Sequence, residues 1–255
     1  MSNTPEKLTQ SPQHDTQGSS SKPKRKSNKL LTIGIVLMML AGVALMAYPT
    51  VADWWNQRTA GYAIAEYESN VEALDQEMVD SMMARARAYN AMISTDETRW
   101  TPSEAETEEY YQCLDVSGTG IMATIEIPSI HVNLPVYHGD SDEVLQTATG
   151  HIEGSTLPTG DKGTHAVISG HTGLPSAKLF TKLDTLKEGD RFIVHVLNMD
   201  FEYEVDNIAV VLPHEFELLE IDPAEDQVTL LTCTPYGVNT HRLLVRGTRV
   251  VDAAE

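Results

Sequence analysis

The amino-acid sequence predicts a mainly β protein, built as a closed or nearly closed antiparallel barrel and tethered by one membrane-spanning helix. After Gly118 the chain consists of short apolar runs, many of them alternating, separated by Gly, Pro, Asn and Asp. This texture is typical of strands and tight turns, not of a βαβ rhythm. Earlier in the chain, Leu30 to Pro49 is a 20-residue stretch without a charged residue. As a helix it is long enough to cross about 30 Å of bilayer hydrocarbon.

The charge balance limits the possible partners. The 255 residues include 18 Lys and Arg against 37 Asp and Glu, a formal net charge of −19. A broad phosphate-binding surface would work against this field, so the sequence predicts no nucleic-acid partner.

The few basic residues near the N-terminus predict the orientation of the anchor. The cluster from Lys22 to Lys29 stands directly before the apolar run. The positive-inside tendency therefore places residues 1–29, a polar and disordered tail, in the cytoplasm, and the acidic bulk outside the cell membrane. A cleaved signal is the alternative, but its apolar region is usually about 7 to 15 residues long and ends at small residues. We expect a single-pass anchor over residues 30–49, in contact with membrane lipid through Leu30–Pro49.

A helical segment is expected between the anchor and the barrel, over residues 50–93. Packing on the barrel is the preferred interpretation of its apolar stripe, and a dimerising coiled coil is the alternative. Residues 94–117 are expected to form a loop and the entry to the barrel, because Ser94–Glu109 is acidic and has Trp100 as its only large apolar side chain. The apolar stripe comprises Ile64, Tyr67, Val71, Leu74, Met78 and Met82.

The barrel domain is expected over residues 118–251, followed by a short tail at 252–255. Short helices fit at Asp142–Thr147 and Ala177–Leu183. No repeat of 20 to 50 residues is present, which excludes solenoids and propellers. The expected strands are Ile121–Ile127, Val132–Tyr137, Ala166–Ser169, Arg191–Leu197, Phe201–Val211, Val228–Cys233 and Arg242–Val251.

The sequence around Cys233 predicts a β-hairpin. Cys233 ends the alternating run VTLLTC and is followed by TPYGVNTH, whose Pro, Gly and Asn suit a turn, before Arg242 opens the next β run. Cys233 and Arg242 would then face each other across the mouth of the hairpin. A disulfide between the two cysteines, Cys113 and Cys233, is the alternative use of this sulfur.

A reactive cysteine needs a thiolate, which a nearby cation favours, and a group that shares protons. Arg242 supplies fixed positive charge. His171 follows the apolar strand HAVIS and Gly170, at a strand end where side chains from different loops can meet. These three residues form a candidate Cys–His–Arg site.

Three segments of the chain resemble a known family. THAVISGHTGLPSAKLF, LLTCTPYGVNTHRLLVRGTR and IEIPSIHVNLPVYHG together look like a class C, pilin-polymerising sortase, and the resemblance covers roughly Tyr110 to Val251. By matching motif, His171 corresponds to the family's histidine, Cys233 to its nucleophile and Arg242 to its arginine.

The resemblance implies an eight-stranded sortase-type β-barrel and a cysteine transpeptidase that needs no cofactor. Such an enzyme cleaves an LPXTG-like sorting signal between Thr and Gly through a thioester. Cys233 would attack the Thr carbonyl, Arg242 would bind the developing oxyanion, and His171 would protonate the leaving Gly amine. The implied partners are pilin subunits with LPXTG-like C-terminal signals, whose acceptor lysine amine completes an isopeptide bond.

The sequence departs from the family pattern in two places. It has no Asp-Pro-aromatic lid tripeptide, and Trp100, with Asp96 nearby, is the candidate substitute, expected to dock over the cleft that holds Cys233. Many members also carry a second C-terminal span, whereas this sequence ends at Val251-Asp-Ala-Ala-Glu255 without an apolar run.

The other singled-out residues have structural interpretations. Arg246 shares a face with Arg242 and is the alternative cation, while Arg249 lies opposite. Cys113 is expected to be a small buried hydrophobe or a loose thiol. Scattered histidines lack the paired spacing of a zinc site, so no metal is expected, and His165 is expected to pack in its strand. They are His131, His138, His151, His165, His214 and His241.

Three other functions compete with pilin polymerisation. A housekeeping sortase that attaches surface proteins to peptidoglycan is the nearest, and a non-catalytic membrane-tethered adhesin is the binding-module alternative. An L,D-transpeptidase would place its histidine close upstream of the cysteine, whereas His171 lies 62 residues before Cys233.

Overall fold

A computed structural model describes residues 29–174 and 176–251 of the chain. These residues divide into two units, one up to Val43 and one from Ala44 onward. Helix α1 (Lys29–Glu72) runs through both and contains the whole uncharged stretch. Within the described residues it is the one helix long and apolar enough to span a membrane. The N-terminal tail and residues 252–255 lie outside the described residues.

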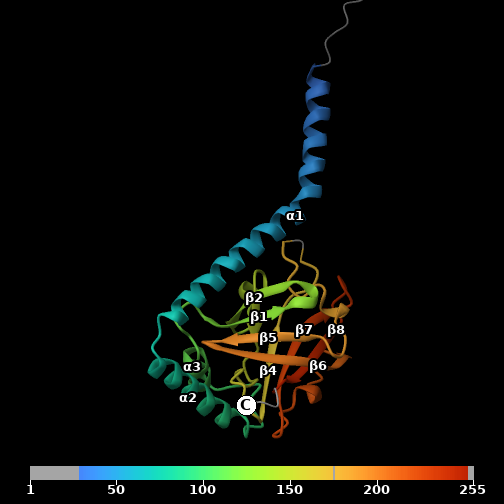
Figure 1. Ribbon diagram of the computed structural model, residues 1–255. Coiled ribbons are helices and arrows are strands. Elements are labelled where there is room, and N and C mark those ends of the chain that lie inside the picture. The colour runs from blue at the N-terminus through green and yellow to red at the C-terminus, as the bar shows by residue number, and fades with distance from the viewer. Residues whose placement is uncertain (1–28, 175, 252–255) are drawn as a thin grey trace, which may run out of the picture. The chain divides into compact units, whose positions relative to one another are not determined.

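The second unit is built on a closed eight-stranded barrel in the order β1-β2-β3-β4-β7-β8-β6-β5 (Figure 1). The predicted mainly β barrel is therefore confirmed. Each predicted strand is present, with ends that differ by at most two residues. The strands are β1 Ile121–Ile127, β2 Val132–His138, β3 Thr149–His151, β4 Thr164–Ser169, β5 Arg191–Val196, β6 Met199–Val211, β7 Asp226–Thr234 and β8 His241–Arg249.

Two features of the barrel differ from the prediction. The ladders β2–β3 and β4–β7 are parallel, so the barrel is mixed and not wholly antiparallel. Strand β3 was not expected, because three residues with a central glycine show no alternation. Its glycine is required by packing: a Cβ on Gly150 would lie 2.1 Å from the carbonyl oxygen of Gly139.

The helical segment before the barrel is broken where one continuous stripe was expected. Helix α2 (Gln76–Ile93) begins after Asp75, whose side chain accepts a hydrogen bond from the backbone N–H of Met78. Because a new helix begins here, the apolar periodicity of α1 does not continue into α2. Met78 is therefore 52% exposed, and Val79 and Met83 are buried instead. The stripe prediction is wrong at Met78 for this reason.

The acidic segment expected as a loop contains a helix, α3 (Glu104–Gln112). Ser103 and Glu106 form a capping box in which each side chain bonds the other's backbone N–H. Acidic residues in the first turn also suit the helix dipole, so acidity here favours helix and not exposed loop.

The short helices were predicted with mixed success. Helix α4 (Asp142–Leu145) lies where one was expected. The expected helix at Ala177–Leu183 is absent, and turns there lead into a 3₁₀ turn at Leu183–Thr185. Two further 3₁₀ turns are Pro128–Ile130 and Glu217–Leu219.

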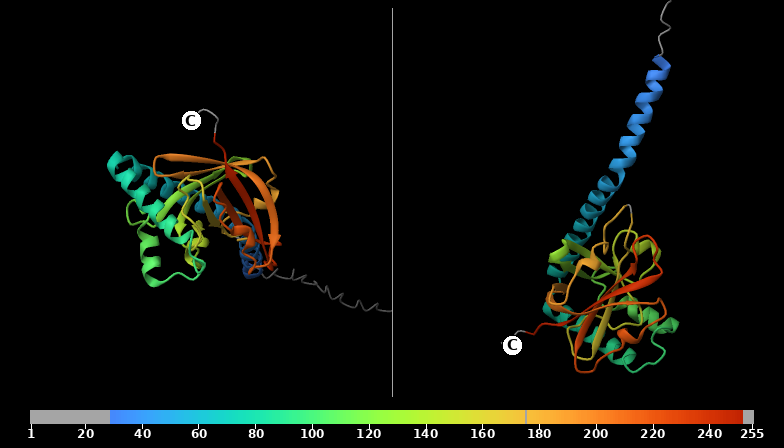
Figure 2. Two further views of the ribbon diagram at one scale, coloured as in Figure 1. Left: turned by 90° about the horizontal axis from the view of Figure 1, so that it is seen from below. Right: turned by 90° about the vertical axis from the view of Figure 1, so that its right-hand side faces the viewer.

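One continuous apolar core joins the barrel interior to the later part of α1, to α2 and to α3. Figure 2 shows these helices along the outside of the barrel from two further directions. Tyr67 of α1 joins the two layers: its hydroxyl donates to the carbonyl of Met122 (3.1 Å) and accepts from the N–H of Leu197 (2.8 Å). Burial raises the pKa of Tyr67 to about 12, so this contact stays neutral and intact over the physiological range.

Candidate active site

Strands β7 and β8 form the predicted hairpin. Cys233 lies directly opposite Arg242 in the antiparallel ladder. The N–H groups of Val238 and Asn239 both donate to the carbonyl of Pro235 at 3.0 Å, which closes the turn. Asn239 takes the left-handed backbone region at φ 59°, a conformation that asparagine tolerates. The expectation that Cys233 and Arg242 face each other across the hairpin mouth is confirmed.

His171 reaches this hairpin through the parallel ladder of β4 and β7. Ser169 stands beside Leu231 in the register. The N–H of Gly170 donates to the carbonyl of Leu231 at 3.0 Å, and the Thr232 hydroxyl donates to the carbonyl of Gly170 at 2.6 Å. The ladder ends at this pair, and two residues farther along the two chain segments lie His171 and Cys233, which line the same groove.

The backbone at Gly170 leaves no room for a side chain. A Cβ there would lie 2.7 Å from Cδ2 of Phe180, whose ring is fully buried. The N–H of Phe180 donates to the carbonyl of His171 at 3.2 Å. The segment after His171 is thus folded back onto the strand end, and glycine is required for that close approach.

His171, Cys233 and Arg242 line one groove of about 370 Å³. All three side chains are half-buried, so they are shielded on one side and accessible to a peptide on the other. Three carboxylates, Asp140, Asp142 and Glu215, are also on the lining, and the rest of the wall is largely apolar. The apolar wall includes Leu145, Ile152, Val211, Leu212, Pro213, Phe216, Leu219, Leu231 and Leu244.

The two candidate cations differ in their partners. The guanidinium Nη1 of Arg242 lies 3.2 Å from the carbonyl of His241 and 3.4 Å from that of Asn239, and no carboxylate in the described residues pairs with it. Arg246 is paired instead, with its Nε 2.9 Å from Asp206. Arg242 therefore keeps its charge available in the groove, and Arg246 does not line it.

Comparisons with known proteins identify the family of this fold. Residues 125–250 match the family model described as the sortase domain. The solved structure of sortase C1 from Streptococcus agalactiae is 46% identical, with a TM-score of 0.73, over 75% of this chain and 99% of that one. The chain belongs to the sortase family. It therefore carries the domain of a cysteine transpeptidase family.

Two further relatives show how far the similarity extends. A solved Streptococcus pneumoniae sortase C is 39% identical, with a TM-score of 0.66, over 76% of this chain and 99% of that one. Sortase A of Bacillus anthracis is 28% identical over 127 residues, which span 50% of this chain and 59% of that relative. Both solved structures are sortases C, and the likeness to them extends beyond the barrel.

Trp100 of this sortase does not line the groove that holds Cys233. It packs behind the groove wall, with its ring 5.5 Å from that of Phe216 and the Arg99 guanidinium 5.0 Å from its centre. Arg99 is buried and donates to the carbonyl of Leu219 at 3.2 Å. The backbone of Arg99 packs closely against that of Gly154. A Cβ on Gly154 would lie 2.4 Å from the carbonyl oxygen of Arg99.

Asp96, the other lid candidate, lies on the preceding turn and outside the groove. Its carboxylate accepts from the N–H and the hydroxyl of Thr98, at 2.8 and 2.7 Å. These bonds lower the pKa of Asp96. Its visible role is to shape the turn that leads to Trp100.

The remaining cysteine and the packed histidine His165 have structural surroundings. Cys113 is fully buried, burial raises its pKa to about 11, and both cysteines are free. His165 is packed as expected, with its ring nitrogens 2.8 Å from the Glu220 carbonyl and 2.7 Å from the Thr229 hydroxyl. Neither Cys113 nor His165 lines the groove.

Sequence reasoning missed the groove wall and the bond from Thr232. The 212–219 segment follows a strand and carries exposed apolar residues, including Phe216 at 43%. Such residues between two strands are the signal that could have placed a wall here. The bond from Thr232 to Gly170 has no sequence signal, because it depends on the parallel β4–β7 pairing.

Proposed function

We propose that this chain is a membrane-anchored cysteine transpeptidase that polymerises pilins. The observation that carries the proposal is the convergence of two ladders. The β7–β8 register sets Cys233 opposite Arg242, and the β4–β7 ladder ends two residues before His171, which lines the same groove. The three side chains share one groove whose largely apolar wall suits an extended peptide.

In the first step, the Cys233 thiolate attacks the carbonyl carbon of Thr in an LPXTG-like signal. An S–C bond forms, and the guanidinium of Arg242 stabilises the negative charge that develops on the carbonyl oxygen. The C–N bond to Gly then breaks as His171 donates a proton to the leaving amine. The product is a thioester on Cys233, which reserves the energy of the peptide bond for transfer.

In the second step, a lysine amine of another pilin attacks the thioester carbon. The new C–N bond is an isopeptide bond, the Cys233 sulfur leaves, and His171 takes up the proton that the amine loses. A groove that limits access of water favours this aminolysis over hydrolysis. The likeness to sortases C supports a pilin as acceptor, since the solved S. pneumoniae enzyme is described by its pilin substrate specificity.

The uncharged part of α1 supports anchoring at the cell membrane. The basic cluster at Lys22–Lys29 precedes it in the sequence, and the positive-inside tendency then leaves the barrel extracellular. An anchored enzyme meets membrane-bound pilin subunits at a raised effective concentration. Protease shaving of intact cells tests the orientation: residues beyond Thr59 are expected to be cut, and their protection while the tail is cut would reverse it.

Trp100 is proposed to take the place of a lid by supporting the groove wall. Its contact with Phe216 buries apolar surface behind a residue that lines the groove. The buried Arg99 and the close approach at Gly154 fix the segment in place. The role is to hold the 212–219 segment near the cysteine.

The product distinguishes this function from its alternatives. Cells that express the chain with its pilin are expected to give a ladder of polymers that resists heat and SDS, because isopeptide bonds survive both. Cys233→Ala is expected to give monomer only. Monomers linked to peptidoglycan would indicate the housekeeping reaction, and free cleaved monomers ending in Thr would indicate a hydrolase. If the pilin stays unprocessed in cells that express the wild-type chain, the result would favour the non-catalytic adhesin.

A further inference from the structure

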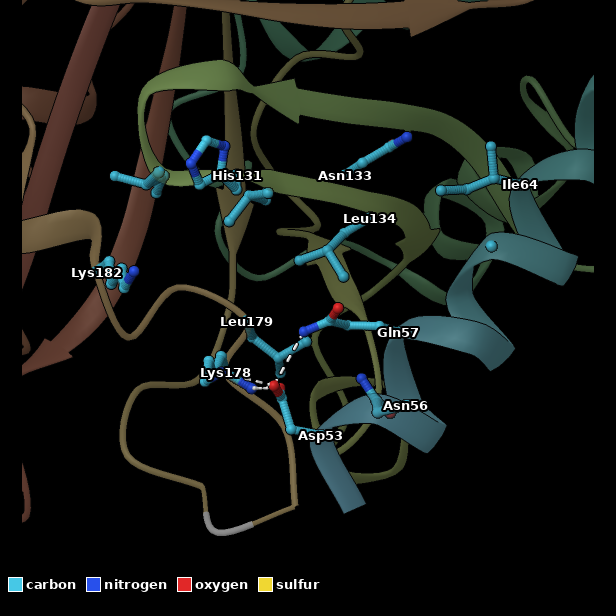
Figure 3. A pocket seen from close by; sticks show the side chains of 13 residues that line it. Asp53, Asn56, Gln57, Ile64, His131, Asn133, Leu134, Lys178, Leu179 and Lys182 are labelled. Carbon is cyan, nitrogen blue, oxygen red and sulfur yellow. Dashed lines mark hydrogen bonds and ion pairs between the residues drawn. The ribbon is translucent and has the colours of Figure 1, made fainter. Parts of the chain in front are cut away.

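A buried carboxylate lies on α1, far in sequence from the catalytic groove. Asp53 is four residues beyond Pro49 and only 6% exposed. Its Oδ1 accepts from the backbone N–H of Lys178 at 3.0 Å, and its Oδ2 accepts from Gln57 at 2.9 Å and pairs with the Lys178 Nζ at 2.8 Å (Figure 3). Because a buried charge is costly unless it is paired and bonded, these contacts are specific features of this site.

Lys178 belongs to the segment that folds back onto His171. Two residues later, the N–H of Phe180 donates to the carbonyl of His171 itself at 3.2 Å. The Thr181 hydroxyl accepts from the N–H of Gly173 at 3.2 Å. Residues 176–181 therefore hold the backbone of His171 from one side, and Asp53 holds those residues.

Apolar packing between α1 and residues 178–182 is incomplete, so the polar contacts of Asp53 contribute more to holding the two together. A cavity of about 430 Å³ separates α1 from the turn around His131 and from residues 178–182. Figure 3 shows Asp53, Gln57 and Lys178 at one edge of this space, with Leu134 and His131 farther along it. The charge-assisted bonds of Asp53 thus bridge helix and segment where side chains do not fill the gap.

The same turn of α1 also reaches the other flank of the groove. The Asn56 amide donates to the carbonyl of Thr147 at 3.0 Å. Thr147 follows α4, whose Asp142 and Leu145 line the catalytic groove. One helical turn therefore contacts the segment that bonds His171 and the residue that follows the groove-lining α4.

We propose that Asp53 is a positioning residue that fixes His171 for proton transfer through the bond to Lys178. The proposal rests on the proposed role of His171 in the transpeptidase reaction. It ties the geometry of the catalytic histidine to the part of α1 that follows the membrane-spanning stretch. A displacement of a proton donor by about 1 Å is enough to slow a reaction strongly, while it leaves peptide binding little changed.

The test uses the full chain in detergent micelles with an LPXTG-like peptide. Asp53→Ala removes all three contacts, and Asp53→Asn keeps an oxygen that can accept from the Lys178 N–H. Lys178→Met removes only the ion pair. Asn70→Ala is the matched control, since Asn70 lies on the same helix and bonds the exposed Ser117.

We expect Asp53→Ala to lower kcat about tenfold with KM changed less than about twofold, and to alter the pH profile of kcat. Asp53→Asn and Lys178→Met are expected to retain most of the activity, because the main-chain bond survives. Hydrogen exchange should rise in residues 176–181 of Asp53→Ala and stay at the wild-type level in residues 94–103. Asn70→Ala should match wild type in every measurement.

Wild-type kcat and unchanged exchange in Asp53→Ala would overturn the proposal. A rise in KM alone, or equal loosening of both segments, would also overturn it, since either indicates a general loss of structure. If Asp53→Ala does not fold, Asp53→Leu decides, because leucine keeps the shape of the side chain but accepts no hydrogen bond from the Lys178 N–H. The same kcat loss and exchange increase are expected of it. A His171→Ala variant that forms the thioester at the wild-type rate would refute the proton-donor role of His171 on which this proposal rests. Absence of the thioester from the wild-type chain would instead refute the proposed function, which separates the two failures.

Discussion

Cys233 and Arg242 are direct partners across the β7–β8 ladder, and the turn from Pro235 to Asn239 lies between them. Opposite residues in an antiparallel pair have Cβ atoms about 4.5–5.5 Å apart. The nucleophile and the cation are thus placed by local hairpin geometry, and neither depends on a distant contact for its position. This arrangement makes the identity of the cation testable.

We expect Arg242→Lys to lower kcat/KM about 10- to 100-fold, because an ammonium cannot reproduce the guanidinium fork at the carbonyl oxygen. Arg246→Lys should stay close to wild type, since Arg246 is paired with Asp206. Steady-state kinetics with a sorting-signal peptide measure both. Retained activity in the first variant and loss in the second would move the role to Arg246.

Trp100→Ala is expected to increase the rate at which a small alkylating reagent modifies Cys233. Loss of the indole removes the support behind Phe216 and loosens the groove wall. Peptide mapping after timed iodoacetamide treatment gives the rate, and Cys113 is an internal reference because it is fully buried and its pKa is raised to about 11. Trp55→Ala, at a ring that is 66% exposed, is the control. An unchanged rate would mean that Trp100 does not restrict access to the cysteine.

The stability of the fold is expected to depend on pH through Asp226, which lies at the opposite end of β7 from Cys233. Burial raises its pKa to about 6, against the bonds that it accepts from Thr164 and Tyr203. The folded state then binds the proton more tightly than the unfolded state. This stabilisation is complete below the unfolded pKa of 3.8 and is lost as the pH rises through about 6.

Asp226→Asn removes that titration and keeps the shape of the side chain. The free energy of unfolding, variant minus wild type, should therefore rise by up to about 3 kcal/mol between about pH 4 and about pH 8. Urea unfolding of both proteins at a series of pH values measures this difference. Asp184→Asn, at an exposed position, should show a much smaller change. If the difference in unfolding free energy does not change with pH, or falls as the pH rises, the raised pKa of Asp226 would be contradicted.

The sequence was most informative where the structure is local. The hairpin of Cys233 and Arg242 could be predicted because the two residues are nine apart and the turn residues between them are typical. The strands of the barrel could be predicted from alternation and turn residues for the same reason. Ser103 and Glu106 carried a capping signal that the acidic composition masked.

Non-local contacts could not be predicted from the sequence pattern. His171 reaches the groove of Cys233 from the end of a parallel ladder, and Asp53 meets Lys178 across 125 positions. Periodicity reports which face of an element is apolar, and it does not report which elements pair. The resemblance to sortases supplied the role of His171, whereas Asp53 became visible only in the folded chain.

Acyl-enzyme formation at Cys233 is the most direct test of the account. The full chain in detergent is mixed with an LPXTG-like peptide, quenched in acid and measured as intact protein by mass spectrometry. We expect a mass increase equal to the peptide up to and including Thr less one water. The adduct should be located on Cys233, released by hydroxylamine and absent from Cys233→Ala. An adduct that persists in Cys233→Ala, or no adduct on a wild-type chain whose Cys233 still reacts with iodoacetamide, would contradict the account.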